Sequence, residues 1–145
     1  MQLQNHLHQH KTTHLLLGIR DINPNLVSKT NYISDRDLFL FQYNLQEQLN
    51  NLSDNIHLVI HLNFFASYLF PNAQPKLEGG PLWWQSLLLI KDVFRLKNIT
   101  QTTLLGFCED CKKSQKNLAQ LLKKLVAYQS VFNQNETELP LFSNN

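Results

Sequence analysis

The clearest pattern of apolar positions lies between Pro81 and Lys97, where apolar residues recur every three or four positions. That interval is the repeat of an α-helix. Pro81 suits the first helical position, because its fixed φ and missing N–H cost nothing there. A helix that is apolar on most of its circumference is buried. The pattern therefore predicts a central buried helix over residues 81–97, with three rows made by Trp83, Leu87, Ile90 and Phe94, by Trp84 and Leu88, and by Leu89, Val93 and Leu96.

Two further helices are predicted, one on each side of the central helix. The first covers residues 35–52, because Ser34 and Asp37 have nearly the spacing and chemistry of a capping box and apolar residues then repeat at helical intervals. The second covers residues 107–132, where an apolar stripe lies opposite a row of lysines. A threonine at 102 or 103 would cap that helix.

Short strands are predicted in two places. Residues 56–65 alternate between apolar and polar or histidine side chains and are rich in β-branched and aromatic residues, which favours a strand. A helix remains the alternative there, because His57 and His61 lie four residues apart and would share a helical face. The apolar run over residues 15–19 favours a strand over a single helical turn.

These elements predict a predominantly helical α+β fold with three main helices and one or two strands. Its globular part would span residues 14–132, between a mobile polar tail at 1–13 and a second tail at 133–145. The alternative is an all-α bundle, which follows if residues 56–70 are helical.

Composition narrows the class of protein. The chain has 145 residues, which suits one domain, and its formal net charge of +2 is too small to indicate nucleic-acid binding by itself. One fifth of the residues are Asn or Gln and only 17% are charged, so the surface field is weak. No apolar run reaches membrane-spanning length, and the N-terminus does not resemble a signal peptide. The two cysteines are too closely spaced to cross-link a fold, which indicates a reducing compartment. We expect a cytoplasmic protein.

Motifs of catalysis and of nucleotide binding are absent from the sequence. There is no G-x-S-x-G, no H-E-x-x-H, no G-x-G-x-x-G and no phosphate loop. The sequence therefore predicts a protein that is not an enzyme and that uses no cofactor.

Two cysteines and two histidines offer an alternative function. Cys108 and Cys111 form a C-x-x-C pair, and with His57 and His61 they could supply the four ligands of a zinc site or a redox pair. The spacing differs from that of a zinc finger, and the acidic residues between the cysteines would raise the pKa of the thiols. The simpler interpretation is two buried structural thiols and no metal site.

Lysines are concentrated in the predicted last helix and could contact phosphates. A solvated outer face is the simpler interpretation, because an amphipathic helix exposes such residues anyway. The candidate nucleic-acid surface comprises Lys112, Lys113, Lys116, Lys123 and Lys124.

The polar tail contains one apolar peptide, whose proline favours an extended conformation. It resembles the clamp-binding peptide of bacterial replication and repair proteins, with Leu139, Leu141 and Phe142 at the hydrophobic positions and Glu138 where that family has glutamine. The resemblance implies a non-enzymatic adaptor in bacterial DNA replication or repair, with the sliding clamp as its protein partner. Two alternatives are that the peptide packs on its own domain and that the chain is a self-associating structural protein. The predicted partner-binding residues are Glu138, Leu139, Pro140, Leu141 and Phe142.

Overall fold

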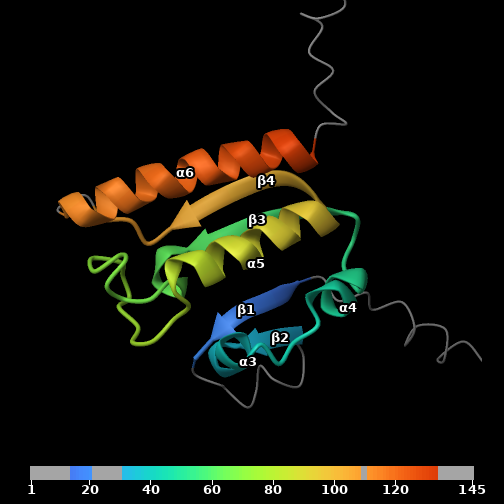
Figure 1. The fold of residues 1–145 in the computed structure, drawn as a ribbon, viewed down its shortest axis with the longest axis horizontal. Coiled ribbons are helices and arrows are strands. Elements are labelled where there is room, and N and C mark those ends of the chain that lie inside the picture. The colour runs from blue at the N-terminus through green and yellow to red at the C-terminus, as the bar shows by residue number, and fades with distance from the viewer. Residues whose placement is uncertain (1–13, 21–30, 109–110, 134–145) are drawn as a thin grey trace, which may run out of the picture.

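The computed structural model describes residues 14–20, 31–108 and 111–133. Its described strands form two parallel pairs, β1 with β2 and β3 with β4, and the two pairs are not hydrogen-bonded to one another. Figure 1 shows the four strands running in one general direction, with β1 and β3 as the inner members of the two pairs. The strands are β1 (Leu15–Ile19), β2 (Asn31–Ser34), β3 (Asn55–His61) and β4 (Asn98–Leu105).

The helices connect and cover these strands. The helix between β3 and β4 is the crossover that a parallel pair requires. The last helix follows β4 and contacts that crossover helix. The helices are α3 (Asp35–Leu40), α4 (Leu45–Asn50), the short 3₁₀ helix η1 (Leu62–Phe64), α5 (Trp83–Leu96) and α6 (Lys112–Phe132).

The α+β prediction is wrong, and so is the all-α alternative. The expected strands at 15–19 and 56–65 correspond to β1 and β3, but the pattern did not reveal β2 or β4. Thr102 and Thr103 were expected to cap a helix and instead lie within β4. Strand pairing is a contact between distant segments, so local periodicity could not show that β3 and β4 pair in parallel. The result is an α/β arrangement.

The predicted helix at 35–52 is interrupted. The capping box exists, because Ser34 Oγ accepts from the Asp37 N–H at 3.0 Å and the Asp37 carboxylate accepts from the Ser34 N–H at 3.3 Å. The helix then ends at Phe41, whose φ is 53°, and a second helix begins after Asn44. Left-handed backbone conformation at a non-glycine residue terminates α-helical hydrogen bonding, and apolar spacing alone does not indicate it.

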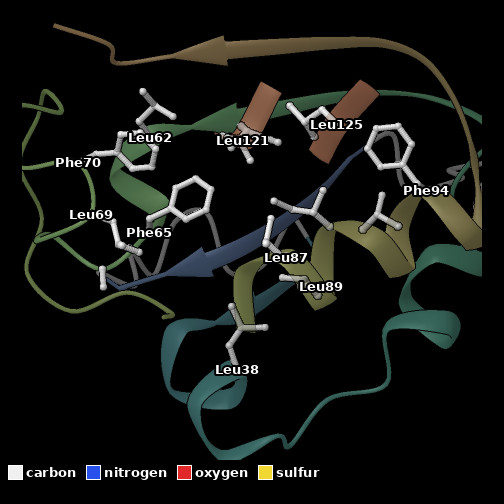
Figure 2. Packing of buried hydrophobic residues seen from close by; sticks show 14 of the residues in the cluster. Leu38, Leu62, Phe65, Leu69, Phe70, Leu87, Leu89, Phe94, Leu121 and Leu125 are labelled. Carbon is white, nitrogen blue, oxygen red and sulfur yellow. The ribbon is translucent and has the colours of Figure 1, made fainter. Parts of the chain in front are cut away.

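The hydrophobic core lies between α5, α6 and the inner faces of the strands (Figure 2). The Phe94 ring packs against Tyr128 of α6 at 6.0 Å, and the Phe65 ring lies 5.1 Å from that of Phe70. The helix α5 is not buried on every side, since Trp84 is 69% exposed. The most deeply buried apolar side chains are Leu62, Phe65, Phe94, Ile99 and Leu121.

Candidate active site at the carboxyl ends of the strands

Ligands of open α/β sheets bind outside the carboxyl ends of the parallel strands. Here the end of β3 brings His61 and Asn63 to that edge, and the end of β4 brings Gly106. Backbone φ at Gly106 is +82°, and a Cβ at this position would overlap the His61 imidazole. The absence of a side chain at 106 therefore lets the ring lie directly on the backbone that follows β4.

Hydrogen bonds fix the histidine and the asparagine. The Asn63 backbone N–H donates to His61 Nδ1 at 3.2 Å, so a neutral imidazole at this position carries its proton on Nε2. The Asn63 side-chain Nδ2 donates to the Pro75 carbonyl at 3.0 Å. The Gln74 N–H in turn donates to the Gly106 carbonyl at 3.4 Å, which ties the loop after η1 to the end of β4.

An arginine connects this edge to the end of β1. The Arg20 guanidinium donates to the carbonyls of Asn63 and of Phe64, the latter at 2.9 Å, and to that of Phe65 at 3.3 Å. Its Nε lies 4.0 Å from the Asp35 carboxylate, and the Arg20 side chain is only 10% exposed. A charged donor of five N–H groups can satisfy several carbonyls at once, which is why an arginine suits this position.

Two glycines, Gly79 and Gly80, allow their backbone to lie close to the Arg20 side chain. The Gly80 N–H donates to the Asp35 carboxylate at 3.3 Å, and a Cβ at 80 would overlap the guanidinium and the Phe65 backbone. Gly79 precedes it with φ of +82°. A cleft of about 710 Å³ lies beside this arrangement, lined among others by Arg20, Asp35, Arg36, Glu78 and Gln85.

The two histidines of the predicted metal site have different contacts. His57 is exposed and its Nε2 lies 2.8 Å from Thr103 Oγ1, whereas His61 packs on Gly106. Across the described ranges, no group of three or more His, Cys, Asp or Glu could hold a metal ion.

The cysteines are partly exposed, so the expectation that both thiols are buried is wrong, while a structural role for them stays a prediction. Cys111 occupies the N-cap position of α6. The pKa of its thiol is lowered, chiefly by hydrogen bonding from the Ser114 backbone N–H. Stabilisation of a thiolate by the amides at a helix N-terminus explains this direction.

The lysines predicted to contact nucleic acid lie along α6. Lys113 Nζ is 5.2 Å from the centre of the Tyr68 ring, and Lys124 Nζ is 6.0 Å from that of Trp84. Both ammonium groups therefore lie over aromatic rings of the same chain, and phosphate binding by this face stays a prediction. The peptide Glu138–Phe142 lies outside the described residues. Among the described helices, none is both long enough and apolar enough to cross a membrane.

Solved structures identify the architecture. Bacillus subtilis arginase superposes with a TM-score of 0.66 at 18% identity, over 77% of this chain and 43% of that one. The fold is that of the arginases and agmatinases. The agmatine ureohydrolase of Thermoplasma volcanium has a TM-score of 0.67 at 15% identity, over 84% of this chain and 44% of that one. Entamoeba histolytica arginase in complex with L-ornithine has a TM-score of 0.64 at 13% identity, over 77% and 42%.

The chain spans less than half the length of each of these ureohydrolases. No protein-family model and no curated protein matches it. The ureohydrolase architecture overturns the prediction of a non-enzymatic adaptor for the sliding clamp, together with its DNA replication and repair role, because the neighbours have an enzyme fold. Sequence reasoning missed His61 and Asn63 as a pair at a strand end, and the signal that could have found them was the polar residue directly after an apolar strand.

Proposed function

We propose that this chain forms part of a hydrolase that cleaves a C–N bond in a guanidino compound. The observation that carries this proposal is the arginase–agmatinase architecture over at least 77% of the chain. One neighbour was solved with L-ornithine, which is the amino acid that remains when the guanidino group of arginine is hydrolysed. The substrate class is therefore a small cation that carries a guanidinium group.

The strand-end residues can recognise such a group. A neutral His61 presents Nε2–H as a donor, because Nδ1 already accepts from the Asn63 N–H. The amide nitrogen of Asn63 is engaged with Pro75, so its Oδ1 is the atom suited to accept from a guanidinium N–H. In this tautomer His61 serves as a hydrogen-bond donor to the oxygen of the forming urea and not as the base.

The hydrolysis itself balances without another reactant. Water adds to the guanidino carbon, the bond from that carbon to the substituted nitrogen breaks, and the nitrogen leaves as an amine after taking a proton. A base that activates the water and an acid that protonates the amine are both required. Because His61 Nδ1 already accepts from the Asn63 N–H and an amide side chain is not basic, we assign the role of the base to neither residue.

Ligand titration with NMR detection tests the proposal. L-arginine and agmatine should shift the amide signals of residues 61–63 and 106, whereas the uncharged ureido analogue L-citrulline should not. Asn63→Leu should abolish the shifts. His61→Phe keeps a ring over Gly106 and should retain binding at reduced affinity. A folded protein whose strand-end signals respond to neither guanidino compound would exclude this site.

A further inference from the structure

The cleft beside Arg20 is a second candidate site. It is lined by residues from the end of β1, from the start of α3 and from the loop that leads into α5. Its volume of about 710 Å³ lies in the range of sites that hold small molecules. Among the described residues, His61 and Asn63 do not line it, so a ligand in this cleft would not occupy the proposed guanidino site.

Two of the four charged side chains that line the cleft are already satisfied by the protein itself. The Arg20 guanidinium donates to the carbonyls of Phe64 and Phe65. The Asp35 carboxylate accepts from the Gly80 N–H at 3.3 Å and lies 4.0 Å from Arg20 Nε. These two side chains therefore belong to the wall of the cleft and offer a ligand little net charge.

The other two charged side chains, Arg36 and Glu78, are exposed and line the same cleft. They form no ion pair with one another or with any other residue that the structure describes. An arginine guanidinium binds a carboxylate through two parallel N–H···O bonds, and a carboxylate accepts from an ammonium group. One ligand that carries both charges can therefore pair both side chains.

Gln85 adds a hydrogen-bond donor to the cleft. Its Oε1 accepts from the Leu82 N–H at 3.0 Å at the start of α5, so its Nε2 keeps both N–H groups for a ligand. The remaining wall includes the apolar side chains of Ile19, Phe39 and Pro81. Phe39 is 72% exposed and offers its ring to the hydrocarbon part of a ligand.

We propose that this cleft binds an α-amino acid with an uncharged apolar side chain, in its zwitterionic form. The carboxylate accepts from Arg36 and from Gln85 Nε2, the ammonium group donates to Glu78, and the apolar side chain packs on Phe39. A simple anion would be repelled by the Glu78 carboxylate, and a simple cation by the Arg36 guanidinium. This site is additional to the guanidino site and does not rest on the proposed function.

Titration with L-leucine, followed by the amide NMR signals of the full chain, tests the proposal. Two relatives of this amino acid each lack one charge, since 4-methylpentanoate has no ammonium group and 3-methylbutylamine has no carboxylate. L-leucine should shift the signals of Arg36, Glu78 and Gln85. Each relative should bind about tenfold or more weakly, which is the usual effect of losing a charge-assisted hydrogen bond. No shift with L-leucine up to about 10 mM, or equal binding of either relative, overturns the proposal.

Three variants with a matched control examine the assigned contacts. Arg36→Gln and Glu78→Gln should each weaken L-leucine binding by about tenfold or more. Gln85→Glu keeps the acceptor for the Leu82 N–H but replaces the donor by a carboxylate oxygen, so it should weaken binding as well. Arg95→Gln changes another exposed arginine and should leave binding unchanged.

The two sites are read out separately. L-leucine has no guanidino group, so the signals of residues 61–63 and 106 should stay in place while those of the cleft move. Unchanged L-leucine affinity in both Arg36→Gln and Glu78→Gln overturns the assignment of the cleft, and so do shifts confined to residues 61–63. Either result leaves the titration with guanidino compounds as an independent test of the proposed function.

Discussion

Replacement of Arg20 by alanine should strongly destabilise the protein. The guanidinium satisfies the carbonyls of Asn63, Phe64 and Phe65 and lies 4.0 Å from the Asp35 carboxylate. The replacement therefore leaves three carbonyls without this donor and the Asp35 carboxylate without the nearby positive charge. It also disconnects the end of β1 from the segment that follows β3.

The magnitude follows from the burial of these groups. Hydrogen bonds that involve a charged group each contribute about 1.5–3 kcal/mol net, and they do not add fully. Removal of one partner of a buried ion pair costs about 3–5 kcal/mol. Arg20 is only 10% exposed, but Asp35 is 25% exposed and water can solvate it in part. We expect Arg20→Ala to lower the free energy of unfolding by about 3–4 kcal/mol.

Urea unfolding followed by circular dichroism measures this change, and a matched arginine provides the control. Arg95 pairs with Asp92 at 3.3 Å on the surface, with its side chain 52% exposed, so Arg95→Ala should cost less than about 0.5 kcal/mol. Arg20→Lys keeps the charge but not the fork of donors and should fall between the two. If Arg20→Ala and Arg95→Ala cost the same, the carbonyl-bridging role of Arg20 is refuted.

Three further changes probe single features. Gly106→Ala should displace His61 and lower the free energy of unfolding, measured by urea titration, by about 1–3 kcal/mol. Gly79→Ala is the control, because Gly79 has the same φ of +82° but its added Cβ would lie 3.2 Å from the nearest atom, Asp35 Oδ2, so it should cost less. Ser34→Ala removes the hydroxyl that caps α3 and should cost about 1 kcal/mol by the same assay, and no loss would show that the capping box is not formed. In a Cys108→Ala background, the rate at which iodoacetamide alkylates Cys111 should rise at a lower pH for the folded than for the urea-unfolded protein, because folding lowers the pKa of this thiol. The free energy of unfolding should then increase as the pH rises from the folded towards the unfolded pKa of Cys111. Coincident alkylation profiles of the folded and the unfolded protein would contradict the cap geometry.

The sequence by itself predicted several local elements. Apolar spacing indicated α5 and α6, although the predicted range of 107–132 began before α6 does, and alternation indicated β3. The same pattern could not reveal β4, because its Thr-Gln-Thr-Thr centre has no clean alternation and one of its faces is exposed. It also could not show the end of α3 at Phe41, which depends on a left-handed backbone conformation.

The candidate site depends on contacts between residues far apart in the chain. His61 lies on Gly106, 45 residues later, and Arg20 reaches Asn63 and Phe64 from the end of β1. Local interactions repeat along the chain and leave a periodic pattern, so the sequence alone determined where α5, α6 and β3 form. Strand pairing and the meeting of strand ends join distant segments through the tertiary structure, which alone decided the parallel topology, the ureohydrolase architecture and the site.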